Sequence, residues 1–206
     1  MKRLAAMFLI STVGLGAAEN GRMSDSERAF LVDQLEQTKK GVLDSLAGLT
    51  PAQWTFKAGP DRWSVQQCAE HIVLAEGFIF DASQKILDSP AVPRPEKSNS
   101  NVDHMLVAGV EDRSKKMSAP EPLVPSGKFA TPEDAIKAFT EARDKSMTYA
   151  KTTDAELRTH VGPGPAGPMD AYQFLLLMAS HSARHTKQIR EVEADPNFPK
   201  ASARGL

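Results

Sequence analysis

Residues 170–194 read DAYQFLLLMASHSARHTKQIREVEA, the most strongly patterned segment of the chain. Apolar residues recur every three or four positions, a Gly- and Pro-rich run at 162–168 precedes the segment, and Asp195-Pro196 follows it. This spacing predicts an amphipathic helix over 170–194. On a helical wheel, His181 and His185 fall within about 60° of the apolar seam, so both imidazoles are expected to face the interior.

Three further segments carry helical periodicity and their own start signals. The Ser24-Asp25-Ser26-Glu27 stretch has the form of a capping box, and so does Ser64 with Gln67. Thr131-Pro132-Glu133-Asp134 combines an N-cap residue, a proline in the first turn and acids at the positive end of the helix dipole. These signals predict helices over 24–48, 64–88 and 131–152.

Four long helices and no sustained strand alternation predict an all-α fold, a four-helix bundle. Gly59-Pro60-Asp61 predicts a turn in the connection between Trp54 and Trp63. The crossover between the second and third helices, residues 90–130, is long, Pro-rich and polar, with one short helix expected around 101–112. Connections of this length are usually functional or disordered. Whether this one folds over the bundle as a lid stays open at this point.

The N-terminus has the form of a signal peptide. Met1-Lys2-Arg3 supplies the basic start, 4–15 is apolar, and Gly16-Ala17-Ala18 provides small residues for cleavage. We therefore expect a signal peptide at 1–18, a mature domain at 19–206 and export to the periplasm or medium. The apolar run is shorter than the roughly 20 residues that span a bilayer, so no stable membrane anchor is expected after processing.

Composition narrows the classes of partner. The 206 residues carry 25 Lys plus Arg against 26 Asp plus Glu, a net charge of −1. This balance provides no general attraction to nucleic acid or anionic lipid. His-Glu-x-x-His, Gly-x-Ser-x-Gly and P-loop motifs are absent from the sequence, so zincin proteases and nucleotide binding have no support. A small-molecule substrate is the expected partner.

A third histidine lies on the seam of the second long helix. His71 shares that face with Cys68, Ala75, Phe78 and Ala82, whereas Glu70 and Glu76 lie well off it on the wheel. Bundle cores are where such folds build metal sites, and His71, His181 and His185 form a plausible ligand set. The alternative is three hydrogen-bonded core histidines that bind no metal.

Other residues are weaker candidates for the same site. Gln188, one turn beyond His185, is placed either to orient a ligand or bound water or simply to close the end of the seam as a polar residue. Arg184 could contact an anionic substrate, although a solvated charge is its default interpretation. Cys68 is a candidate fourth ligand, although a small buried cysteine is its default role. As the only cysteine, it excludes an intrachain disulfide.

The remaining histidines and the tryptophans have simpler expectations. His104 in the crossover and His160 before the last helix could cap the mouth of the site, but exposed loop histidines are the default. Trp54 and Trp63 are expected to pack the first connection against the bundle.

The chain resembles the DinB-like superfamily in three places taken in order: Leu49–Trp54 followed by Arg62–Val65, then Cys68–Ile72, then His181–Ile189. In that family a Trp-Ser pair opens the second helix, one histidine follows on it, and a His-x-x-x-His pair on the last helix completes the ligand set. The resemblance implies a four-helix bundle, often dimeric, with a divalent ion on His71, His181 and His185. Family members include metal-dependent hydrolases and transferases that join low-molecular-weight thiols to electrophiles.

Three neutral imidazoles suit zinc, nickel or iron and leave the charge of the ion uncompensated. Such an ion lowers the pKa of bound water toward about 7 and deprotonates a coordinated thiol. We expect a hydrolase acting on a small electrophile, because export separates the protein from cytoplasmic thiols. A thiol transferase and a non-catalytic metal- or ligand-binding bundle stay as alternatives, and no catalytic residue is assigned.

Overall fold

The computed structural model describes residues 21–165 and 167–200. The predicted signal peptide, residues 1–18, lies outside the described residues. The elements in chain order are α1 (Asp25–Leu46), α2 (Pro51–Thr55), α3 (Val65–Ile86), α4 (Ser100–Glu111), the 3-10 helix η1 (Glu121–Leu123), α5 (Pro132–Thr152), β1 (Val161–Gly164), β2 (Gly167–Asp170) and α6 (Ala171–Glu193).

The four long helices begin where the sequence predicts them to begin. Ser24, Ser64 and Asp170 each accept a hydrogen bond from the backbone N–H three residues on, and the side chain at that position returns one, which completes the capping box. Thr131 caps α5 through the backbone N–H of Asp134. The short helix expected near 101–112 is α4.

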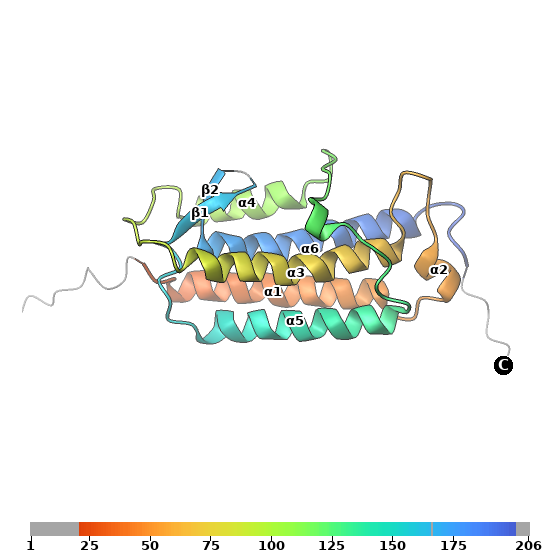
Figure 1. Cartoon of the computed structure of the whole chain (residues 1–206), viewed down its shortest axis with the longest axis horizontal. Helices are drawn as coiled ribbons and strands as arrows, with labels where there is room; N and C mark the ends of the chain where they lie inside the picture. The colour runs from red at the N-terminus through yellow and green to blue at the C-terminus, as the bar shows by residue number, and fades with distance from the viewer. Residues whose placement is uncertain (1–20, 166, 201–206) are drawn as a thin grey trace, which may run out of the picture.

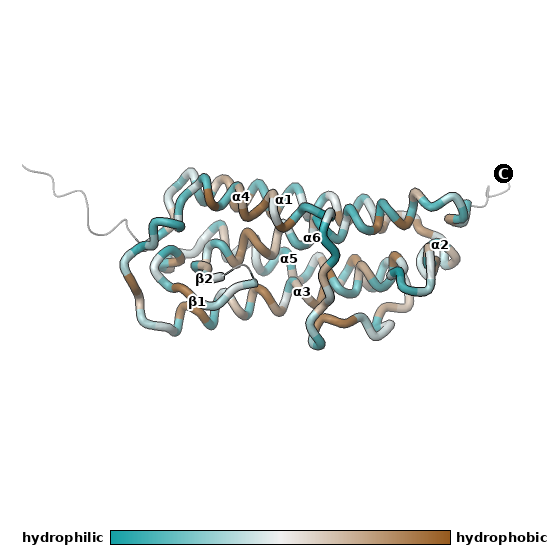
Figure 2. The backbone as a smooth tube through the Cα atoms, turned by 90° about the horizontal axis from the view of Figure 1, so that it is seen from above, coloured by the Kyte–Doolittle hydropathy of each residue, from teal (hydrophilic) through white to brown (hydrophobic). Residues whose placement is uncertain are grey.

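The long helices form a closed ring of four. The last helix, α6, packs against α1 and α3, and α5 packs against the same two helices from the other side (Figure 1). Figure 2 shows hydrophobic and hydrophilic residues recurring in turn along each of these helices, as expected for bundle members with one face inside. The prediction of a four-helix bundle is confirmed. None of the described helices is both long and apolar enough to cross a membrane.

The interior contains two apolar clusters separated by a polar layer. One cluster includes Leu31, Leu35, Leu175 and Leu176, and the other includes Trp54, Ile72, Phe139 and Ile189. On α6, His181 and His185 lie between Ala179 of the first cluster and Ile189 of the second. On α3, His71 lies at the border of the second cluster, one turn before Ala75 of the first. The polar layer therefore crosses the middle of the bundle.

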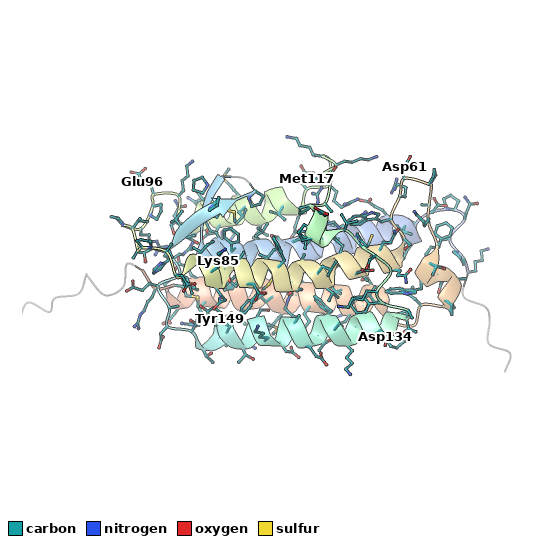
Figure 3. All side chains as sticks on the ribbon, viewed as in Figure 1. Asp61, Lys85, Glu96, Met117, Asp134 and Tyr149 are labelled. Carbon is teal, nitrogen blue, oxygen red and sulfur yellow. The ribbon has the colours of Figure 1, made fainter. Side chains whose placement is uncertain are left out.

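The crossover folds along the bundle. It leaves the end of α3, adds α4 against α6, and reaches the start of α3 again at Phe129, whose carbonyl accepts from Gln66 and Trp54. It must therefore cover the length of α3, about 33 Å for 22 residues. Figure 3 places Met117 on this crossover, on the side of the molecule away from α5.

The structure corrects the sequence prediction at two connections. The run at 162–168 is expected only to break helices, whereas in the structure β1 and β2 pair here in antiparallel register, Val161 with Asp170 and Gly164 with Gly167. Gly167 has φ +112°, and a Cβ at Gly162 would lie 2.7 Å from Cγ1 of Ile86. The glycines therefore allow the tight turn and its contact with α3, rather than only ending helices. The connection after α1 contains α2, capped by Thr50 with Gln53.

Candidate metal centre

His71 enters the polar layer from α3. Its side chain is only 3% exposed, and its Nδ1 lies 2.7 Å from the carbonyl oxygen of Leu123 in η1. A carbonyl oxygen only accepts, so Nδ1 carries the proton and donates it. The Nε2 atom of His71 consequently keeps its lone pair, directed toward α6.

His181 and His185 come from successive turns of α6. His185 donates from Nδ1 to Oε1 of Gln188 at 2.9 Å, which leaves its Nε2 with a lone pair as well. Nη1 of Arg113, in the crossover, donates to the same Gln188 oxygen at 3.2 Å. Gln188 therefore contacts His185 directly, and its role in orienting a metal ligand stays a prediction.

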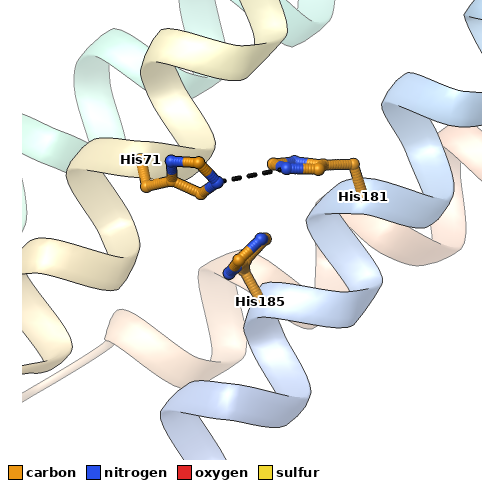
Figure 4. Close-up of side chains that lie close together, drawn as sticks. All are labelled: His71, His181 and His185. Carbon is orange, nitrogen blue, oxygen red and sulfur yellow. Dashed lines mark hydrogen bonds between the residues drawn. The ribbon is translucent and has the colours of Figure 1, made fainter. Parts of the chain in front are cut away.

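The three imidazoles converge on one point between α3 and α6. One ring nitrogen from each lies within 4.8 Å of the other two, and the Nε2 atoms of His71 and His181 are 3.2 Å apart (Figure 4). Two nitrogens bound to one zinc at about 2.0–2.1 Å would lie roughly 3.0–3.5 Å apart. The donor set and the His71–His181 spacing therefore fit a divalent ion of the kind that imidazole prefers.

His181 is the least satisfied of the three as it stands. Its Nδ1 is buried and has no hydrogen-bond partner among the described residues. Within the part of the chain that the structure describes, the hydrogen-bond partner of its Nε2 is His71 alone. Buried polar atoms normally find partners, so an imidazole in this state is typical of a site that takes up a ligand.

Burial keeps the three rings neutral. It lowers the pKa of His181 to about 3 and that of His185 to about 2, with further lowering from the neighbouring histidines. Burial also lowers the pKa of His71, although its bond to Leu123 opposes the shift. At neutral pH each ring is thus neutral and keeps one nitrogen lone pair that can bind a cation.

Trp63 forms one wall of the site. Its ring centroid lies 4.8 Å from that of His71 and 6.1 Å from that of His185. Trp54, in contrast, is buried at the α2 end and donates its Nε1–H to the carbonyl of Phe129 at 3.4 Å. Trp54 therefore packs the first connection against the bundle, as expected, whereas Trp63 also borders the histidines.

Several expectations for the surroundings change. Arg184 is not a solvated charge: it is buried, and its guanidinium donates to the carbonyls of Val110, Asp112 and Lys115. The Arg184 guanidinium therefore binds the crossover and is not free to bind an anionic substrate. Phe78, placed on the His71 seam, is 50% exposed, because only part of that wide face of α3 meets α6.

Cys68 is buried as its default interpretation required, and it is not a member of the histidine cluster. Burial raises the pKa of its thiol to about 12, which disfavours the thiolate that metals bind.

His104 and His160 also lie apart from the cluster. His104 stacks on Phe30 from α4, and His160 contacts the carbonyl of Ser89 through Nδ1.

Sequence reasoning missed two buried carboxylates beside the site. Glu76 pairs with Arg143 of α5, and Ser182 on α6 donates to it at 2.7 Å. Glu70 accepts from the backbone of Ser126, Gly127 and Lys128. The wheel placed both off the His71 face correctly, but α3 also packs against α5 and the crossover, so an off-seam position is still interior. Arg143, among the charged residues of α5, gave no signal of burial.

The comparisons agree with this architecture. Among solved structures, YfiT from Bacillus subtilis, described as a probable metal-dependent hydrolase with an unusual four-helix bundle topology, aligns with a TM-score of 0.57. The alignment covers 83% of this chain and 88% of YfiT at 16% sequence identity. No curated protein matches the chain. The family model of the DinB superfamily matches residues 34–189, which run from α1 to α6 and include all three histidines. The chain belongs to the DinB superfamily.

Proposed function

We propose that His71, His181 and His185 bind one divalent metal ion and that the protein is a metal-dependent hydrolase of a small electrophilic substrate. The observation that carries the proposal is the convergence of three neutral imidazoles, of which His71 and His185 are buried and have their tautomer set by an outer acceptor. Outer contacts of this kind are typical of metal-binding histidines.

When bound, an ion on neutral ligands with open positions lowers the pKa of water and polarises a carbonyl. The chain's own contribution is to aim the Nε2 atoms and to keep charge away from them. Neither Glu70 nor Glu76 is free to move a proton, because backbone N–H groups hold the first and Arg143 holds the second. We therefore assign no catalytic carboxylate.

The enclosure of the site favours a small substrate. His71 and His185 are at most 8% exposed, with Leu123 and Trp63 beside them. The likeness to YfiT, a probable metal-dependent hydrolase, supports the same direction through shared fold. We further propose that zinc, nickel or iron is the native ion, since imidazole suits all three.

A second candidate function is metal binding without turnover. The commitment of both buried carboxylates favours it, because the site then lacks a separate acid or base. A thiol transferase would need an external thiol, since the Cys68 thiol is buried with its pKa raised. We also propose that the protein is exported after cleavage behind Ala18. Export would separate it from cytoplasmic thiols, and we therefore prefer the hydrolase. N-terminal sequencing of the secreted form tests the cleavage.

Elemental analysis of the untagged protein, purified without chelator, tests the metal site. We expect near-stoichiometric metal in the wild type, its loss in His71→Ala, and retained helical content by circular dichroism. His104→Ala, which changes an exposed histidine outside the cluster, is the matched control. No metal in the wild type after reloading with zinc, nickel and iron would contradict the proposal.

The reaction needs a separate test with the loaded protein. Panels of esters, amides and thiol-plus-electrophile pairs distinguish the three functions. Turnover of an ester or amide that disappears in His71→Ala supports the hydrolase. Turnover that requires an added thiol supports the transferase, and metal binding without turnover of any substrate supports the passive role.

A further inference from the structure

The crossover is attached to α3 at two consecutive residues of the metal centre. His71 donates to the carbonyl of Leu123, and the neighbouring Glu70 holds the backbone three to five residues further on. We refer to residues 123–128 as the strap. The strap connects η1 to Phe129, and it lies against α3 next to the three histidines.

Glu70 holds the strap through four hydrogen bonds. Its Oε1 accepts from the N–H of Ser126 at 2.8 Å and from the Ser126 hydroxyl at 3.0 Å. Its Oε2 accepts from the N–H groups of Gly127 at 2.8 Å and Lys128 at 3.0 Å. Gly127 has φ +88°, the left-handed conformation that turns successive N–H groups toward one anion. The strap is thus a backbone nest for this carboxylate.

The carboxylate is suited to hold this nest. Its side chain is 1% exposed, and both of its oxygens are occupied by the strap. Burial raises the pKa of Glu70, but the N–H donors of the strap outweigh it, so the pKa lies below its usual value. A buried charge without these donors would be costly, so the strap and the carboxylate depend on each other.

Only two residues separate Leu123 from Ser126, so the nest fixes where the Leu123 carbonyl can lie. That carbonyl is the acceptor for Nδ1 of His71, and it determines which nitrogen of His71 carries the proton. Loss of the nest therefore releases the group that aims Nε2 of His71 toward His181 and His185. Glu70 has no oxygen left to bind an ion itself.

We infer that Glu70 is a positioning residue of the metal centre: by binding the strap, it holds the Leu123 carbonyl that sets the tautomer and orientation of His71. The inference rests on the proposed function, because it assigns Glu70 a role in the same site. It predicts that Glu70 controls the affinity of the site for metal, although Glu70 contacts no ring nitrogen of the three histidines.

The first test uses the apoprotein and its imidazole signals. In long-range 1H–15N spectra, the wild type should show Nδ1–H tautomers for His71 and His185. Glu70→Gln, which keeps the size of the side chain but places an amide donor against N–H groups, should remove the fixed tautomer of His71. His185, held by Gln188, should keep its own and serves as the internal control. An unchanged His71 signal overturns the inference.

The second test measures affinity for zinc by competition with a chromophoric chelator. We expect Glu70→Gln to weaken zinc binding about 10- to 100-fold, the usual effect of losing an outer partner of a ligand. Asp81→Asn removes an exposed carboxylate from the same helix and should stay within twofold of the wild type. Binding by Glu70→Gln within twofold of the wild type, with unchanged helical content, contradicts the inference.

Gly127→Ala reaches the same contact from the strap and keeps the test decisive if Glu70→Gln does not fold. A Cβ at Gly127 meets no atom within 4 Å, so its effect comes from the positive φ rather than from a clash. It should change the His71 tautomer in the same way, and no change would count against the inference. If the wild type binds no metal, the proposed function fails, but the apoprotein spectra still decide the role of Glu70.

Discussion

Glu76 and Arg143 form an ion pair inside the bundle with essentially no exposure to solvent. Arg143 also donates to the carbonyl of Leu35 at 2.8 Å and to the hydroxyl of Thr38 at 2.7 Å. The pair therefore joins α3, α5 and α1, and Ser182 adds α6. Buried pairs of this kind contribute little net stability over apolar residues, but each partner depends strongly on the other.

We predict that Glu76→Gln destabilises the fold by about 3–5 kcal/mol, because it leaves the Arg143 guanidinium buried without a counter-charge. Urea unfolding followed by circular dichroism measures the change. The double variant Glu76→Leu with Arg143→Met should be more stable than Glu76→Gln alone. This is expected because Ser182 and Thr38 keep backbone carbonyls as acceptors. A double variant less stable than the single one would contradict this account.

At the residue scale, the sequence was informative about the candidate metal-binding histidines and uninformative about the residues that support them. His71, His181 and His185 could be predicted because helical spacing alone places them on seams. Glu70, Glu76 and Arg143 could not, because their burial depends on elements far away in sequence. The partner of Glu70 is a backbone nest more than 50 residues on, and backbone N–H groups leave no signature in residue types.

At the element scale, the crossover packs as part of the domain. Arg184 of α6 attaches it by donating to the carbonyls of Val110, Asp112 and Lys115, where α4 ends. The last carbonyls of a helix lack partners within the helix, so a buried cation there stabilises the end of α4. Whether the crossover can open as a lid therefore depends on how strongly Arg184 attaches it to α6.

We predict that Arg184→Ala loosens the crossover without unfolding the bundle. The lost charged hydrogen bonds cost about 1–3 kcal/mol, and they cost it locally. Hydrogen exchange followed by mass spectrometry should show faster exchange in residues 108–117 and unchanged exchange in α1 and α5. Arg190→Ala, an exposed arginine on the same helix, is the control and should leave the crossover unaffected. Equal exchange in wild type and Arg184→Ala would contradict the prediction.

Helix starts could be predicted well because a capping box is contained in four consecutive residues, as at Ser24 and Ser64. The hairpin at 161–170 could not, because its Gly and Pro residues equally well describe an irregular loop. The pairing of Val161 with Asp170 depends on the conformation of the turn between them, which the residue types do not specify. The small hairpin does not alter the bundle, but it orients the entry into α6.

At the scale of the whole molecule, the histidine site joins segments that are more than 100 residues apart. His71 lies on α3 and the other two histidines lie on α6, and these two helices pack against each other. The unfolded chain does not hold these imidazoles together. An ion that needs all three therefore binds the folded state preferentially and stabilises it by mass action.

We predict that zinc at about 100 times its dissociation constant stabilises the protein by about 2.7 kcal/mol. Chelator should reverse the effect, and His71→Ala combined with His185→Ala should abolish it. Urea unfolding at fixed protein concentration, with and without zinc, measures the difference. His160→Ala, outside the cluster, should keep the full effect. If zinc stabilises the double variant as much as the wild type, it binds at another site. The proposed three-histidine site would then not be the source of the stabilisation.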